Sequence, residues 1–540
     1  MPLRRSFRKR VPMKYSKNEN AGNREKITRT EYSMRNTSVA LVSRITAIVM
    51  GYLLRVVFTH TLSESYVGLN GLFIDIISVL SLSEMGISTA ITFALYRPIA
   101  EGDIEKQKSL MLLYRRFYRG VVAGVAVLGL ALIPFMRLLI KDYSDIDHLI
   151  LIYLLYLANT VCSYLLVYKK TLLDAQQKMY IGVFYQTLSW VIMDILKIIV
   201  LLVWKNFILF LAIEIVTTLA CNFCISRAAD RRNPYLRDKD IKALPMEEKK
   251  EIFSNIRAMM MHKAGAVIVN NTDNLMLSAF VGLLSVGSYS NYYLLLGSVK
   301  QILNQVYQGI TASVGNLGVM EDEKRVKRVF EAAVFIGQWM YGVAFICLFE
   351  LLNPFVEISF GKQFLFSGEI MFVLCLNFYL NGLRNAALTF RDSMGLFWHD
   401  RYKAILEAGL NIVFSLVLVN YMGTIGVFLG TLFSMLLSSC WIEPYILYKY
   451  GFKCSCKGYF LRQGLYIAVM AAVWLVTDAA CSAVAAGLGS LYAELLVRLV
   501  LCMAVSNVLL LLIYGRTADF KYAVSKAAGF LKEKLKMHKN

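Results

Sequence analysis

Long apolar runs separated by short charged segments dominate the chain. About 14 such runs can be counted, and most match the roughly 20 residues that a helix needs to cross a bilayer. They cover 37–61, 67–96, 118–138, 148–168, 180–203, 207–226, 258–281, 287–314, 330–352, 367–390, 403–420, 424–447, 461–486 and 491–514. Only eight prolines occur in 540 residues, as expected for a set of intact helices. The pattern predicts an all-α integral membrane protein with about 14 transmembrane helices.

The charged segments between the runs predict the orientation in the membrane. If the N-terminus is cytosolic, the inner segments hold 47 of the 58 lysines and arginines. The outer segments hold four, namely Arg137, Lys141, Lys205 and Lys362. Lysine and arginine accumulate in cytoplasmic loops. The distribution therefore predicts a multi-pass protein of the bacterial cytoplasmic membrane with both termini in the cytosol.

The longest charged segment, 227–257, separates six runs from the next six. Short sequences near the end of the second run of each half are weakly alike, at 86–90 and 309–312. We therefore expect two pseudo-symmetric six-helix lobes related by an axis along the membrane normal. The expected divisions are a basic cytosolic tail at 1–35, lobes at 36–226 and 258–450 joined by a cytosolic linker at 227–257, two further helices within 451–515, and a second basic tail at 516–540.

Composition excludes several functional classes. The net charge of +21 could suit nucleic-acid binding, but the basic residues are placed as topology signals rather than on one reading face. The ten cysteines lie mostly within apolar runs and the five histidines are isolated, so no metal centre is expected. No glycine-rich phosphate loop ending in Gly-Lys-Ser or Gly-Lys-Thr occurs. We expect a transporter without a cofactor rather than an enzyme.

Ionisable residues inside the apolar runs are candidate site residues, because charge within a bilayer is costly. Several lie at helical spacing with amides and phenols: Arg44 and Arg55; Lys263 and Asn270; Tyr293, Lys300, Asn304 and Tyr307; Asn381 and Arg384. If these stripes face one lumen, that lumen is cationic and suits a pyrophosphate that carries sugars. The alternative for Arg44 is that its side chain reaches the cytosolic interface.

Embedded acids suggest a coupling-ion site. Glu407 and Asn411 are four residues apart on one predicted helix, and Asp273 lies on another. Oxygen ligands from two helices could hold Na⁺, and a carboxylate could instead carry H⁺. The alternative is that Asp273 balances the charge of Lys263 or Lys300.

Several stretches together resemble one family of bacterial transporters. Residues 66–73, 83–87 and 96–100 resemble the second helix of polysaccharide transporters, 168–178 their fourth-to-fifth helix junction, and 273–275 with 286–292 their seventh and eighth helices. The family contains the O-antigen and lipid-linked oligosaccharide flippases of the multidrug/oligosaccharidyl-lipid/polysaccharide exporter superfamily. The resemblance covers about 36–450 and implies two lobes around a central cavity that opens alternately to each side. In similar lipid II flippases a cation site joins helices 7, 11 and 12.

The resemblance and the cationic stripes together predict a flippase for polyprenyl-pyrophosphate-linked oligosaccharide in cell-surface polysaccharide biosynthesis. Its expected partners are this substrate, membrane lipids and the polysaccharide polymerase machinery, with no nucleic acid. One alternative is a multidrug or metabolite exporter of the same superfamily. Another is a membrane glycan polymerase or ligase, although the longest outer segment, about 353–366, is short for catalytic loops.

Overall fold

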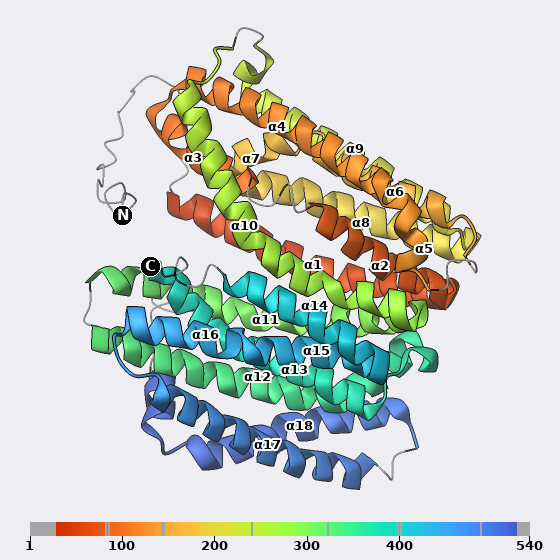
Figure 1. Cartoon of the computed structure of the whole chain (residues 1–540), viewed down its shortest axis with the longest axis vertical. Helices are drawn as coiled ribbons and strands as arrows, with labels where there is room; N and C mark the ends of the chain where they lie inside the picture. Colours follow the sequence, from red (N-terminus) through yellow and green to blue (C-terminus); the bar gives the residue numbers. More distant parts are fainter. Residues whose placement is uncertain are drawn as a thin grey trace.

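Helices make up all of the regular secondary structure in the described part of the chain. The structure is a computed structural model that describes residues 29–81, 84, 87–141, 146–238, 241–320, 323–394, 396, 399, 402–485 and 489–525. The long helices form two bundles, and a helical hairpin packs against the outer side of the second bundle (Figure 1). The predicted all-α class is confirmed.

The first bundle contains the helices up to residue 232. They are α1 (Arg29–Thr61), α2 (Glu64–Leu80), α3 (Ile87–Glu101), α4 (Ile104–Ala131), the short η3 (Ile133–Phe135) and α5 (Met136–Leu139), α6 (Leu149–Tyr164), α7 (Val167–Ala175), α8 (Met179–Trp204) and α9 (Phe207–Arg232). Side-chain caps fix two of the helix starts: Asp103 accepts from the Lys106 amide at the start of α4, and Asn206 from the Leu209 amide at the start of α9. Among the helix pairs in contact, α1 packs on α8 and α6 on α9.

The second bundle follows the turn η5 (Pro234–Arg237). It contains α10 (Met246–Met276), η6 (Leu277–Val281), α11 (Leu283–Met320), α12 (Glu323–Phe360), η7 (Lys362–Phe364), α13 (Gly368–Ser393), α14 (Lys403–Met422), α15 (Thr424–Leu437), α16 (Ser439–Ile446) and η9 (Leu447–Gly451). Helix α10 contacts α2 and α3 of the first bundle as well as α14 and α15 of the second, so it lies between the bundles (Figure 1).

The last two long helices, α17 (Lys457–Ala485) and α18 (Leu491–Tyr514), form the hairpin and pack on α12. Arg498 of α18 pairs with the buried Glu350 of α12 at 2.6 Å and with Glu494 of its own helix at 2.9 Å. The Trp339 indole of α12 donates to Asn507 of α18 at 2.9 Å. Polar contacts as well as apolar packing therefore hold the hairpin against the second bundle.

Two boundaries differ from the sequence prediction. The run 67–96 was predicted as one helix, but α2 ends at Leu80 and α3 begins at Ile87. The intervening sequence contains two serines and a glycine, which are weak helix formers. The segment 227–257, predicted as a loop, is largely helical, because α9 continues to Arg232 and α10 starts at Met246. Apolar periodicity locates helices by their membrane-facing parts and misses polar extensions.

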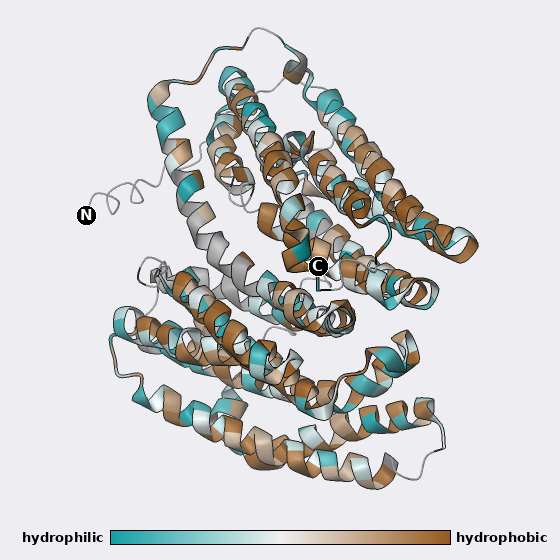
Figure 2. Ribbon diagram, turned by 45° about the vertical axis from the view of Figure 1, so that its right-hand side comes forward, coloured by the Kyte–Doolittle hydropathy of each residue, from teal (hydrophilic) through white to brown (hydrophobic). Residues whose placement is uncertain are grey.

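Nine helical segments in the described ranges are long and apolar enough to cross a membrane, or ten if the bent pair α6 and α7 forms one span. Figure 2 shows apolar residues along the length of these helices. All 14 predicted runs fall on helices, but α10, α11 and α13 are not among the nine although each exceeds 25 residues. All three contribute residues to the cavity described below. The chain is a multi-pass membrane protein; the count of 14 spans stays a prediction.

Close packing between α2 and α11 joins the two bundles, and we call the contact of residues 67–71 with residues 283–291 the seam. A methyl group on Gly68 would collide with the Leu283 carbonyl, and one on Gly71 with the Ser290 side chain. Glycine is required at these positions because the two helices approach so closely. Residues 67–71 and 286–291 of the seam belong to the sequences that carry the family resemblance.

Candidate functional site

A cavity of about 400 Å³ lies within the second bundle, between α10, α11, α13, α14 and α15. Six charged side chains line it: Lys300, Arg384, Arg391, Lys403, Asp273 and Glu407. Tyrosines and amides, including Tyr293, Asn377 and Asn381, complete its polar wall. The four cationic and two acidic groups give this lining a formal excess of positive charge.

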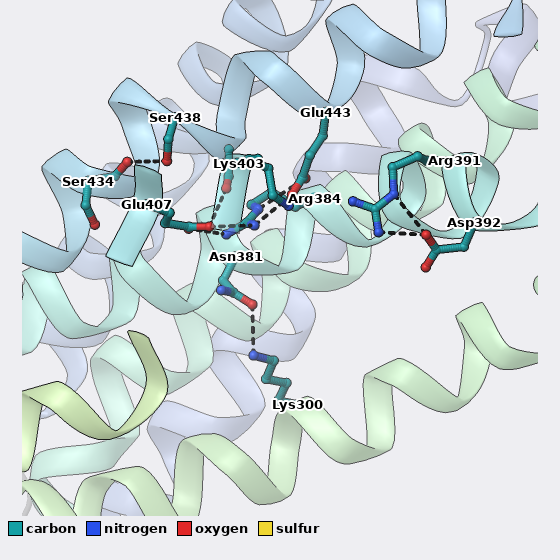
Figure 3. A network of polar contacts seen from close by, with 11 residues as sticks. Lys300, Asn381, Arg384, Arg391, Asp392, Lys403, Glu407, Ser434, Ser438 and Glu443 are labelled. Atoms are coloured by element: carbon teal, nitrogen blue, oxygen red, sulfur yellow. Dashed lines mark hydrogen bonds and ion pairs between the residues drawn. The ribbon is translucent and has the colours of Figure 1, made fainter. Parts of the chain in front are cut away.

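Arg384 lies at the centre of an ion-pair network that three helices form (Figure 3). Its guanidinium contacts Glu407 of α14 at 3.0 Å and Glu443 of α16 at 2.7 Å. Lys403 also pairs with Glu443, which is fully buried. A buried carboxylate needs such partners to remain charged. The charge of Arg384 is therefore partly neutralised by these two carboxylates, and the ion pairs connect α13 to α14 and α16.

Lys300 has a different environment from Arg384. Its ammonium group donates to the Asn381 carbonyl oxygen at 2.8 Å (Figure 3). No carboxylate forms an ion pair with it among the residues described. Lys300 is therefore a cationic group on the cavity wall whose charge is available to an anion.

Arg391 extends the cationic wall along α13. It is buried and pairs with the exposed Asp392 at 2.6 Å. Asn377, Arg384 and Arg391 repeat at seven-residue spacing, which places them on one helix face. Arg391 follows the apolar run 367–390 and Lys403 stands at the very start of the run 403–420, so neither was counted as an embedded charge or proposed as a site residue. The seven-residue spacing was the signal that could have identified Arg391.

An acidic cluster forms one end of the cavity. The Asp273 carboxylate accepts hydrogen bonds from Thr431 at 2.9 Å and from Tyr289 at 3.3 Å. The Asn411 amide donates to the same Thr431 hydroxyl at 2.9 Å. The structure thus links Asp273 to Asn411 through Thr431, a residue that no sequence pattern singled out. Glu407 instead faces Arg384 and accepts from Ser439 at 2.5 Å.

The other predicted lumen residues lie elsewhere. Arg44 is exposed and donates to Gln301 at 3.1 Å, and Arg55 donates to Asn291 of the seam at 2.6 Å. Asn304 accepts from Tyr341 at 2.8 Å, while Tyr307 is buried against the Ala333 carbonyl. The side chains of Lys263 and Asn270 lie outside the described residues. Of the predicted lumen set, the cavity brings together Tyr293, Lys300, Asn381 and Arg384.

Lys197 follows Asp194 by three residues on α8, but it forms its ion pair with Glu214 of α9 at 2.5 Å. Its ammonium also lies over the Phe210 ring, 4.3 Å from the centroid. The sequence could identify the nearest acid on the same helix, but it could not show that α9 packs beside α8.

Comparison with known proteins identifies the family. A family model described as "Polysaccharide biosynthesis protein" matches residues 33–310, just over half of the chain. The chain belongs to this family. No curated protein sequence in the comparison matches it.

Solved structures similar to this family member are transporters. The lipid II flippase MurJ in an inward closed conformation has a TM-score of 0.65 and 13% identity, covering 89% of this chain and 99% of its own. An inward-facing multidrug resistance MATE transporter of the MOP superfamily has a TM-score of 0.57 and 12% identity, covering 76% and 98%. A mutant of the Vibrio cholerae MATE transporter VcmN has a TM-score of 0.52 and 14% identity, covering 78% and 98%. At these identities the similarity shows a shared fold.

Proposed function

We propose that this protein is a flippase that moves polyprenyl-pyrophosphate-linked oligosaccharide across the bacterial cytoplasmic membrane, with both termini in the cytosol. The observation that carries the proposal is the cavity lined by Lys300, Arg384, Arg391 and Lys403. The cavity lies in a protein that belongs to the polysaccharide biosynthesis family and shares its fold with a lipid II flippase.

The chemistry of the cavity fits the two polar parts of such a substrate. Arginine binds phosphate oxygens through a planar fork and lysine through a point charge. Lys300 and Arg391 would hold the pyrophosphate, while Arg384 remains between its two carboxylates. Amides and phenols such as Asn377, Asn381 and Tyr293 can bond sugar hydroxyls.

An ion gradient would drive the cycle in place of ATP. The proposed coupling site is the cluster of Asp273, Thr431 and Asn411, in which carboxylate, hydroxyl and amide oxygens come from three helices. Such oxygen ligands suit Na⁺. Glu407 is excluded from this proposed ligand set because Arg384 and Ser439 already occupy its carboxylate.

Replacing Lys300 by glutamine tests the proposal. The change removes the uncompensated cation and keeps a polar side chain. We expect binding of farnesyl pyrophosphate to protein in nanodiscs to weaken about tenfold, since about 1.4 kcal/mol corresponds to one decade. Farnesol binding should not change. In cells, lipid-linked oligosaccharide should accumulate on the cytosolic leaflet at normal protein abundance.

Lys362→Gln provides the matched control, because this lysine is 83% exposed and lies outside the cavity. It should bind farnesyl pyrophosphate like the wild type. Unchanged pyrophosphate binding and export in Lys300→Gln would contradict the proposal.

A multidrug exporter remains the second candidate because MATE transporters share the fold. The cationic lining disfavours cationic drugs, which it would repel. Efflux assays with a cationic dye separate the candidates: saturable efflux by the wild type would favour drug transport.

A further inference from the structure

Another pocket, of about 120 Å³, lies where the hairpin helix α17 meets α12 and η9 (Figure 1). Its walls come largely from the N-terminal turns of α12 and α17, and its described lining shares no residue with the cavity of the proposed function. The positive-inside distribution predicts that these turns are cytosolic. A single water needs roughly 10–15 Å³ of such space, so the pocket can hold a group of several heavy atoms.

Two cations in the lining retain capacity for an anion. Arg462 pairs with Glu331 at 3.6 Å and with Asp519 at 3.8 Å. Both distances exceed the roughly 2.7–2.9 Å of a charge-assisted hydrogen bond. Lys327 contacts the Cys454 thiol at 3.4 Å, and no carboxylate forms an ion pair with it in the described part of the chain. The lining therefore sets two cations, Lys327 and Arg462, against the carboxylate of Glu331.

Gln463 provides an independent indication of a ligand. Its side chain is only 9% exposed, and its amide oxygen accepts from Gln338, whose own oxygen accepts from the Tyr379 hydroxyl at 2.5 Å. This chain of hydrogen bonds fixes the orientation of the Gln463 amide. Its nitrogen therefore faces Tyr459 of the pocket wall, and it has no hydrogen-bond partner among the residues described. Buried polar atoms normally have a partner.

The first turn of α17 adds the partial positive charge of a helix N-terminus. Gly458 lines the pocket together with Ser455, whose hydroxyl accepts from the Lys457 amide at 3.3 Å. The free backbone N–H groups at the start of a long helix attract anions, and α17 has 29 residues. An ammonium, a guanidinium, an amide N–H and a helix start are the donor types that recognise phosphate oxygens.

We propose that this pocket is a phosphate-binding site separate from the cavity of the proposed function. Lys327, Arg462 and Gln463 hold the phosphate group against the start of α17. The group belongs either to the headgroup of an anionic phospholipid or to a soluble phosphate compound, which present the same chemistry. Leu461 and Leu465 are 77% and 60% exposed, so apolar surface suited to lipid chains begins beside the pocket.

A bound phosphate group joins α12 to α17. It thereby adds a contact that holds the hairpin against the second bundle at the predicted cytosolic end. The trans-membrane movement of a substrate is not part of this inference, which goes beyond the proposed function.

The test uses the exposed Cys454 as a reporter, because its thiol lies 3.4 Å from the Lys327 ammonium. Full-length protein in dodecyl maltoside, a detergent without phosphate, reacts with an uncharged maleimide, and mass spectrometry of the Cys454 peptide gives the rate. Dioleoylphosphatidic acid and inorganic phosphate are the probes. Diolein, which has the same chains and no phosphate, is the control. We expect a phosphate probe to slow labelling saturably and diolein to leave it unchanged.

The two probes distinguish the sources of the phosphate group. Protection by phosphatidic acid at concentrations where inorganic phosphate has no effect supports a lipid headgroup. Equal protection by both at equal phosphate concentration supports a soluble compound. Absence of protection by either probe would overturn the inference.

Lys327→Gln and Arg462→Gln test the assigned residues. Each removes one cation and breaks no described ion pair shorter than 3.6 Å, so the fold should persist. With each rate compared to that of the same variant without ligand, half-protection should need about tenfold more probe. Lys449→Gln is the matched control, because this exposed lysine of η9 lies outside the pocket lining. Wild-type protection in both cation variants would also overturn the inference. Lys300→Gln should retain wild-type protection of Cys454, so this site and the flippase proposal can fail separately.

Discussion

At the scale of single residues, the cavity contains cations of two kinds. Arg384 is surrounded by Glu407 and Glu443, whereas Lys300 has an amide partner. Helical spacing in the sequence predicted that Asn381 and Arg384 share a face. It could not predict that the carboxylates of two other helices meet Arg384, because periodicity within one helix contains no information about its neighbours.

Arg384→Ala should destabilise the protein more than it weakens pyrophosphate binding. It leaves the fully buried Glu443 with Lys403 alone, and breaking a buried pair costs about 3–5 kcal/mol. Arg384→Lys keeps the positive charge, so part of the stability and export should remain. The rest should be lost, because lysine cannot form the planar two-sided contact. The thermal unfolding midpoint of each variant in nanodiscs measures the loss of stability.

The double variant Arg384→Ala with Glu443→Gln should recover part of the lost stability, since the unpaired charge is removed. Arg97→Ala is the control, because its pair with Glu101 is exposed and solvent screens such pairs, so its loss should barely change stability. An unfolding midpoint for Arg384→Ala equal to the wild type would show that the network does not stabilise the fold.

At the scale of elements, apolar periodicity predicted where helices lie but not where they stop. Helix α13 continues to Ser393 and carries Arg391 into the cavity wall, although the residue follows the apolar run. Conversely, α2 stops at Leu80 inside the predicted run 67–96, where two serines and a glycine follow. Polar helix extensions such as that of α13 depend on tertiary contacts, which a single sequence does not display.

Gly68→Ala and Gly71→Ala should weaken the seam. The added methyl groups meet the Leu283 carbonyl and the Ser290 side chain, and a helix backbone cannot move aside cheaply. We expect the bundles to separate there, so a cysteine replacing the fully buried Asn291 should become reactive to a polar maleimide. Gly124→Ala is the control, since nothing lies within 4 Å of a Cβ added at Gly124. Unchanged reactivity in both seam variants would show that the seam tolerates the added volume.

At the scale of the whole molecule, the structure places the cavity in the second bundle and Arg55 at the contact between bundles. The sequence grouped Arg55 with Lys300 and Arg384 because all three are embedded cations. Their separation follows from the packing of α1 beside α11 and from the position of α10 between the bundles. The family and the all-α fold were predictable from pattern and motif order; the distribution of charge between bundles required the three-dimensional arrangement.

Labelling with a membrane-impermeant maleimide tests the orientation of the whole molecule. The positive-inside distribution places the turn at Lys362 outside and the chain around Cys454 in the cytosol. Cys454 is exposed and lies between the membrane-crossing helices, so it serves as a native reporter of the inner side. In intact cells, wild-type protein should remain unlabelled, and Lys362→Cys should be labelled because its side chain is 83% exposed. After permeabilisation, the wild type should gain label, and replacing Cys454 with serine should remove most of it. Labelling of Cys454 in intact cells, with Lys362→Cys reactive only after permeabilisation, would invert the orientation and with it the direction in which the cationic cavity accepts its substrate.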